Sequence, residues 1–150
     1  MNNLNLKIKM LTKTATRPTK AHEDDACFDI YADVPNEKTI IIKPHTTQKI
    51  HTGLSTEIPI GYWGAIFARS GIATKKGLRP AQGVPVIDSG YRGEWLIPLH
   101  NDSDVEEIVE HGERIAQFTL LPYPHINLID VEELENTDRG ETGFGNSGRF

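Results

Sequence analysis

The sequence is poor in cysteine and in long apolar stretches. Its 150 residues include one cysteine, Cys27, so neither an intramolecular disulfide nor a CxxC metal or redox pair can form. No apolar run approaches the roughly 18 residues that cross a bilayer. The composition, 37% hydrophobic and 25% charged, is typical of a globular chain. These features exclude membrane-spanning and disordered proteins and predict one main domain.

Positive charge is also scarce. The chain has 16 Lys and Arg residues against 21 Asp and Glu residues, a net charge of -5. Because sequence-independent nucleic-acid affinity comes from clustered Lys and Arg, we expect no direct nucleic-acid binding. Basic residues gather in residues 1–20 and acidic residues in 102–135, and we interpret both stretches as solvated faces. Residues 1–18 lack the continuous apolar core of a secretory signal, which predicts a cytoplasmic protein.

Period-two alternation of apolar and polar residues dominates the chain and predicts an all-β fold. Gly and Pro residues fall mostly between the candidate strands, as expected for turns. Only SGIATKK (70–76) predicts a helix, with Ser70 as its N-cap and Gly77 at its end. The expected architecture is a jelly-roll-like β-barrel or sandwich with this one short helix. The expected strands span residues 4–10, 28–32, 39–43, 48–58, 62–68, 84–87, 94–100, 105–109, 115–121 and 126–131.

Several common catalytic motifs are missing. There is no GxxxxGK[ST] phosphate loop, no GxGxxG, no HExxH and no GxSxG, so the corresponding ATPase, dinucleotide-binding, zinc-protease and α/β-hydrolase classes lose support. The sequence VIDSG (86–90) resembles the catalytic turn of retroviral-type aspartic proteases. That alternative is disfavoured, because bulky Tyr91 and charged Arg92 follow and no clear partner motif lies downstream.

Five segments together resemble the motifs of the trimeric dUTPase family, the dUTP diphosphatases, in order and spacing. They are DACFDIYA (25–32), ARSGIA (68–73), GVPVIDSGYRGEW (83–95), GERIAQF (112–118) and RGETGFGNSG (139–148). The resemblance implies hydrolysis of dUTP to dUMP and pyrophosphate, which limits uracil incorporation into DNA and supplies dUMP. It also implies a homotrimer whose active sites are shared between subunits.

By this resemblance, Asp88 is the general base that orients water for attack on the α-phosphorus. Tyr91 would pack on the deoxyribose and leave no room for a 2'-hydroxyl, which excludes UTP. The resemblance assigns six residues to the binding of the substrate's base and sugar, namely Gln82, Gly83, Val86, Ile87, Tyr91 and Phe144. Backbone groups of the hairpin would hydrogen-bond the edge of uracil, so cytosine would leave buried polar groups unpaired.

The resemblance also assigns phosphate ligands, which are Arg69, Ser70, Gly71, Gln117, Arg139 and Ser147. Arg69 and Ser70 stand at the start of the predicted helix, where exposed N–H groups favour phosphate. Mg²⁺ is implied by the triphosphate, and no direct protein ligand is expected. Asp29 either lies near the metal's water shell or has a structural role, pairing with an arginine such as Arg69.

The C-terminal residues differ from the β domain expected over residues 1–138. Residues 139–150 are rich in glycine, and we expect a mobile arm that closes over the active site. The ending Asn146-Ser147-Gly148 departs from the family's usual Gly-Ser-Thr-Gly, so the exact contacts of this arm stay open.

Two alternatives keep the same fold. Asp88-Ser89-Gly90-Tyr91 lacks the second acid of the usual Asp-x-Asp-Tyr and resembles the related dCTP deaminases. Those enzymes place a catalytic glutamate ten residues after the aspartate, where this chain has Pro98, which cannot transfer protons. The other alternative is a non-catalytic protein that senses nucleotides or binds a partner.

Overall fold

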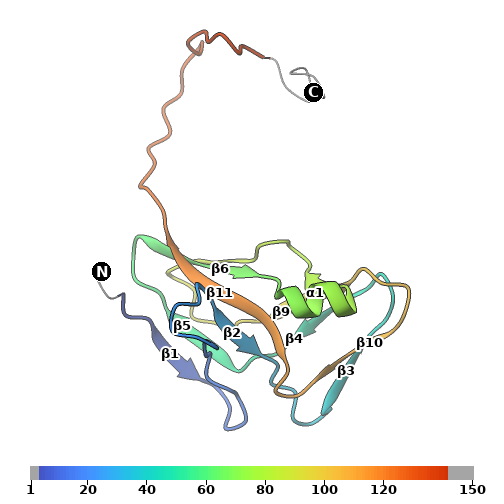
Figure 1. Cartoon of the computed structure of the whole chain (residues 1–150). Coiled ribbons are helices and arrows are strands. Elements are labelled where there is room, and N and C mark those ends of the chain that lie inside the picture. Colours follow the sequence, from blue (N-terminus) through green and yellow to red (C-terminus); the bar gives the residue numbers. More distant parts are fainter. Residues whose placement is uncertain (1–3, 142–150) are drawn as a thin grey trace.

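The computed structural model describes residues 4–141, and within them the fold is mostly β with one short helix. Figure 1 shows the strands gathered into one body and the segment after the last strand leading away from it. In chain order the elements are β1 (Lys7–Met10), β2 (Phe28–Tyr31), β3 (Thr39–Ile42), β4 (Thr47–Ile50), β5 (Leu54–Glu57), β6 (Tyr62–Phe67), α1 (Ser70–Lys76), β7 (Leu78–Pro80), β8 (Val86–Ile87), β9 (Ile97–Asn101), β10 (Glu107–Glu110) and β11 (Arg114–Pro122).

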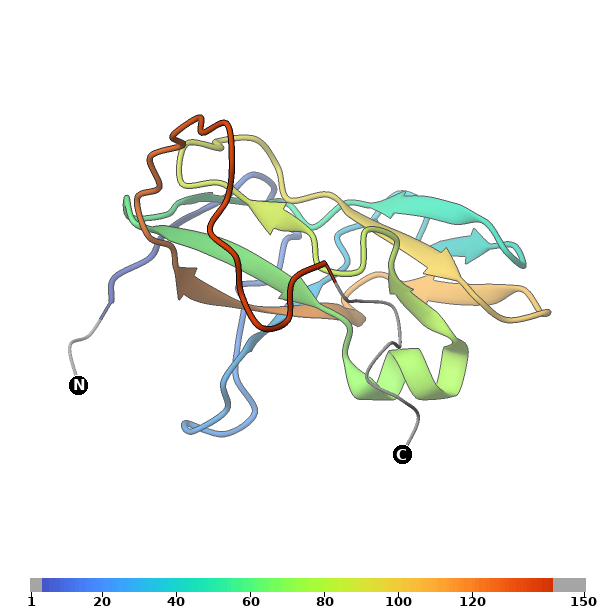
Figure 2. The ribbon, with the colours of Figure 1, turned by 90° about the horizontal axis from the view of Figure 1, so that it is seen from above.

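The paired strands are all antiparallel, and pairs such as β1 with β5 join segments far apart in the sequence. The largest sheet has four strands in the order β2-β11-β6-β8. A three-stranded sheet, β4-β9-β7, and the pairs β1-β5 and β10-β3 complete the body. Figure 2 shows these sheets from above, with α1 at the end of β6. This arrangement is the jelly-roll β fold that the sequence predicts.

The core lies between these sheets and is centred on Trp95, which is fully buried. The indole meets the ring of Phe118 edge-on, with 4.9 Å between ring centroids. Gly64 of β6 is needed beside it, because a side-chain carbon there would lie 3.2 Å from atoms of Trp95, Ile58 and Ile87. Trp95 therefore packs closely on β6 beside the edge strand β8.

The predicted helix has the expected bounds, but its expected cap is wrong. Arg69 is the N-cap residue, in extended conformation and without a capping side-chain hydrogen bond, and Ser70 is the first helical residue. Gly77 ends the helix as predicted, with a left-handed φ of 64° and its N–H bonded to the carbonyl of Ala73.

Two strand predictions are wrong. The single strand expected over 48–58 is interrupted at residues 51–53, where Gly53 has a φ of +62° and donates its N–H to the Glu94 carboxylate. Residues 126–131 form no strand, because no other described segment pairs with them and their large apolar side chains are exposed. The structure also contains β7, which alternation had not indicated.

Candidate active site

Asp88 directly follows the short strand β8. The two residues of β8 pair with Gly64 and Ala65 of β6, which anchors the backbone while the Asp88 side chain is exposed. Two neighbouring hollows share this residue. One, of about 160 Å³, is lined by Val86, Ile87, Asp88, Tyr91, Glu94 and Leu96. The other, of about 480 Å³, is lined by Trp63, Val86, Asp88, Ser89 and Tyr123.

The turn after β8 brings Tyr91 to the first of these hollows. The backbone N–H of Tyr91 bonds to the carbonyl of Asp88 at 3.1 Å, which closes the turn. The Tyr91 hydroxyl donates to the carbonyl of Glu94 at 2.9 Å. Gly93 lies beneath the ring, and any side-chain carbon there would overlap the phenol. Tyr91 is therefore held beside Asp88 by its backbone N–H and by its hydroxyl.

Not all residues predicted for the substrate's base join this group. Val86, Ile87, Asp88 and Tyr91 line one hollow, whereas Gln82 and Gly83 lie in the preceding turn and line neither hollow. That turn is closed by a bond from the Gly83 N–H to the Pro80 carbonyl at 3.0 Å.

Three of the predicted phosphate residues, Arg69, Ser70 and Gln117, lie in a second cluster around Asp29. The Asp29 carboxylate is only 12% exposed and accepts from Arg69 Nε at 2.6 Å on one oxygen. Its other oxygen accepts from Arg114 Nη1 at 3.1 Å. Asp29 thus pairs with Arg69, in keeping with the structural role foreseen for it. Arg114 was not foreseen, because its position 85 residues along the chain gives no local signal.

Strand register explains why these residues meet. Gln117 of β11 lies opposite Asp29 on one side and opposite Phe67 on the other, two residues before Arg69. The Gln117 amide donates to the carbonyl of Ala68 at 2.9 Å. A cavity of about 370 Å³ covers the cluster and is lined by Ala21, Asp25, Ala26, Cys27, Asp29, Arg69, Ser70, Arg114 and Gln117.

Cys27 lies in this cavity, and burial raises the pKa of its thiol, as does the Asp29 carboxylate, while Lys20 opposes the shift. At neutral pH the thiol is thus protonated. Gly71, by contrast, faces open space, and nothing lies within 4 Å of where its side chain would begin.

The two clusters lie toward opposite ends of β6. Ile87 pairs with Gly64, and Asp88 shares its larger hollow with Trp63 near the start of the strand. Arg69 comes six residues after Trp63, which corresponds to up to roughly 20 Å along an extended chain. No residue lines both a hollow at Asp88 and the cavity around Asp29, so the two clusters are separate cavities of the described chain.

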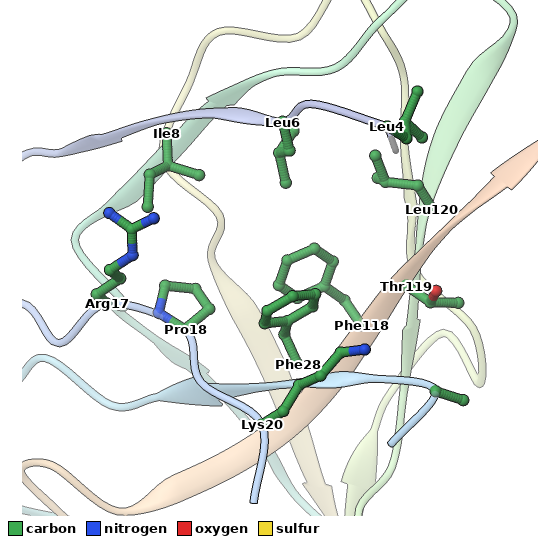
Figure 3. A pocket seen from close by; sticks show the side chains of 11 residues that line it. Leu4, Leu6, Ile8, Arg17, Pro18, Lys20, Phe28, Phe118, Thr119 and Leu120 are labelled. Atoms are coloured by element: carbon green, nitrogen blue, oxygen red, sulfur yellow. The ribbon is translucent and has the colours of Figure 1, made fainter. Parts of the chain in front are cut away.

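A separate groove of about 380 Å³ lies between β1 and the strands β2 and β11. Figure 3 shows its apolar floor, with Phe28 and Phe118 stacked and the basic side chains of Arg17 and Lys20 at one side. Its lining consists of Leu4, Leu6, Ile8, Arg17, Pro18, Lys20, Ala26, Phe28, Phe118, Thr119 and Leu120.

The predicted arm is described only in part. Arg139 lies in a turn closed by a bond from the Gly140 N–H to the carbonyl of Thr137 at 3.0 Å. Phe144 and Ser147 lie outside the described residues. In residues 4–141, no three His, Cys, Asp or Glu side chains are grouped to hold a metal ion. No helix in the same range is long and apolar enough to span a membrane.

Comparison with known proteins gives a consistent result. The family model for dUTPase matches residues 13–148. A deoxyuridine 5'-triphosphate nucleotidohydrolase of Hydrogenobaculum sp. (strain Y04AAS1) is 36% identical over 145 residues, which cover 97% of this chain and 99% of that protein.

Solved structures agree. A mutant dUTPase of Staphylococcus bacteriophage 80alpha, determined with dUpNHpp, matches with a TM-score of 0.85 and 31% identity and covers 96% of this chain and 98% of its own. A mutant dUTPase from phage phi11 of S. aureus, described as coordinating a structural Mg(II) ion, has a TM-score of 0.75 and 26% identity, over 88% of this chain and 99% of its own.

Proposed function

The chain belongs to the dUTPase family and is a dUTP diphosphatase, and from this premise we propose how its residues carry out the reaction. Asp88 accepts a proton from the water that attacks the α-phosphorus of dUTP. The bond from that phosphorus to the bridging oxygen breaks, and dUMP and pyrophosphate leave. The observation that carries this proposal is the turn that holds Asp88 and Tyr91 at one hollow.

The same hollow selects the deoxyribose and the uracil. Tyr91 lies against the sugar, and its fixed ring leaves no volume for the 2'-hydroxyl of UTP. β8 ends the four-stranded sheet, so Val86 and Ile87 have backbone groups on the side away from β6 that can bind the edge of uracil. Gln82 and Gly83, in the turn before β8, border the uracil from outside the hollow.

The triphosphate binds at the cluster around Asp29. Arg69, Ser70, Gly71 and Gln117 supply a guanidinium, a hydroxyl and N–H donors to the phosphates. Asp29 orients Arg69 through the 2.6 Å ion pair and is a positioning residue rather than a ligand. Arg139 and Ser147 add phosphate contacts from the arm, and Phe144 stacks on uracil when residues 139–150 close over the nucleotide.

Mg²⁺ enters with the nucleotide rather than through a protein cage. Asp29, which lines the proposed triphosphate cavity, already accepts from two arginines, so its oxygens are engaged. This fits an ion coordinated mainly by phosphate oxygens and water, with Asp29 at most contacting that water. The ion would neutralise phosphate charge.

The active unit is a homotrimer in which different subunits supply the two clusters. The separation of Asp88 from Arg69 along β6 supports a site completed by another copy. The exposed segment after β11 supports it too, since its apolar residues are 59 to 93% exposed, namely Ile126, Leu128, Ile129, Val131 and Leu134. Acidic residues follow within the same segment, at positions 130, 132, 133 and 135, which suits the groove of Figure 3 with Arg17 and Lys20 beside its apolar floor.

Two measurements test this function. The first follows phosphate release in a pyrophosphatase-coupled assay, with product analysis, on dUTP, dCTP, dTTP and UTP with Mg²⁺. We expect a monophosphate from dUTP alone. Ammonia from dCTP would instead establish deamination, and binding of dUTP without turnover would indicate a sensor.

The second measurement is the dUTPase activity of mixed oligomers. Two variants expected to be inactive, Asp88→Asn and Arg69→Ala, are unfolded, mixed and refolded together. If one site takes Asp88 and Arg69 from different chains, some mixed sites contain both native residues and activity returns. Sedimentation equilibrium should give three times the mass of the 16.8 kDa chain. A monomer that is fully active would contradict the shared site.

A further inference from the structure

We propose that Glu94 is a positioning residue that sets the place of Tyr91 and hence the preference for deoxyribose over ribose. This inference rests on the proposed function, because it concerns how the same hollow discriminates between sugars. Glu94 lines the hollow with Asp88 and Tyr91, yet its carboxylate points to another part of the chain.

The Glu94 carboxylate accepts three hydrogen bonds from the turn between β4 and β5. One oxygen accepts the backbone N–H groups of Thr52 at 3.1 Å and Gly53 at 2.8 Å. The other is 2.9 Å from Nδ1 of His51. Because both oxygens are engaged, Glu94 is poorly placed to act as a second base. Its carboxylate instead ties residue 94 to residues 51–53.

Thr52 and Gly53 are buried, and no other described residue accepts from their N–H groups. Thr52 is 1% exposed, and both residues lie between β4 and β5, outside the strand pairs. A buried N–H without a partner is costly, so the carboxylate strongly favours a single position for residue 94. The backbone around it follows, with the Trp95 N–H bonded to the carbonyl of Leu54 at 2.8 Å.

Tyr91 takes its position from residue 94. Its hydroxyl donates to the Glu94 carbonyl at 2.9 Å, and its ring lies over Gly93. A shift of the Glu94 backbone therefore moves the hydroxyl end of the ring, and with it the part of the hollow's lining that Tyr91 forms. Steric exclusion of a 2'-hydroxyl depends on that position, because an apolar pocket alone rejects an added hydroxyl only about 100-fold.

The test compares kcat and KM for dUTP and UTP in the full chain and in variants at residue 94. Glu94→Ala should reduce the ratio of kcat/KM for dUTP to that for UTP by about 10-fold or more, since a displacement of 1 Å can cost about 100-fold in rate. Glu94→Gln keeps an oxygen that accepts from Thr52 and Gly53, so it should restore the ratio to within about threefold of the native value.

Glu113 provides a matched control, because its carboxylate is 25% exposed against 24% for Glu94. It likewise accepts from one basic side chain, Lys76, and from a backbone N–H, that of Glu110. Glu113→Ala should lower thermal stability to a similar degree but leave the dUTP to UTP ratio within about twofold. Should Glu94→Ala fail to fold, Glu94→Asp tests the same point, because its shorter side chain cannot reach the N–H groups of Thr52 and Gly53 without moving the backbone of residue 94.

The outcomes separate the two proposals. If the native chain shows no preference for dUTP, the proposed function fails. If the native preference is present and a folded Glu94→Ala or Glu94→Asp variant keeps it in full, the positioning role is overturned. The role also fails if Glu94→Gln is as unselective as Glu94→Ala, or if Glu113→Ala loses the preference equally.

Discussion

The ring of Tyr91 lies on the backbone of Gly93, in a space that no other residue type leaves open. The contact requires the absence of a side chain at 93, and the hydrogen bond from Tyr91 to the Glu94 carbonyl completes it. The ring of Tyr91 is therefore held in place as a wall of the hollow beside Asp88.

Gly93→Ala should displace this wall. The added methyl group overlaps the phenol, so Tyr91 must rotate and lose its bond to the Glu94 carbonyl. We expect kcat/KM for dUTP to fall by about 10- to 100-fold. Competition assays with dUTP and UTP measure the effect, and unchanged kinetics in a folded variant would show that the ring position is unimportant.

Asp88→Asn should abolish turnover and retain nucleotide binding. Asparagine has the same shape but cannot take a proton from water, and loss of a general base typically costs about 10² to 10⁴ in rate. Single-turnover kinetics give the chemical step, and calorimetry with a non-hydrolysable dUTP analogue gives the affinity. Turnover near the native rate would remove Asp88 as the base.

Asp29→Ala should impair phosphate binding by releasing two arginines at once. Arg69 and Arg114 lose their shared partner, so KM for dUTP should rise more than kcat falls. Stability should drop by about 1 to 3 kcal/mol, less than for a fully buried pair, because Arg114 is 47% exposed. Arg114→Ala is the companion variant, and an equal KM for it and the native chain would assign the effect to Arg69 alone.

Cys27 should react slowly with thiol reagents. Burial raises the pKa of the thiol, and since only the thiolate reacts, the labelling rate should stay low at pH 7 and rise at a higher pH than for a free cysteine. Rates of alkylation across pH 7 to 10 measure this. Because the thiol lines the phosphate cavity, dUTP should slow labelling further, whereas an unaffected rate would mean that the nucleotide leaves this cavity open.

Removal of residues 139–150 should depress turnover without unfolding the β core. In the described chain the buried core ends at Phe118 and residues 123–141 are exposed, so the described part of the removed segment, residues 139–141, contributes no buried residue. Circular dichroism and thermal melting give the stability, and the dUTP assay gives the activity. A collapse of thermal stability would show that this segment is structural.

The sequence by itself determined the local features of the molecule. Alternation of apolar and polar residues predicted most of the strands, and SGIATKK followed by Gly77 predicted the helix and its end, because these features depend on neighbouring residues. The order of the five motifs indicated the family.

The tertiary structure alone decided how distant residues meet. It brought Arg114 to Asp29 across 85 positions, and Glu94 to Gly53 across 41. The second contact lies where the expected strand is interrupted, at 51–53. There the N–H groups of Thr52 and Gly53 donate to the Glu94 carboxylate instead of to a neighbouring strand. Residues 126–131 show the converse, because alternation predicts a strand there, but a strand forms only where another backbone is present to pair with it.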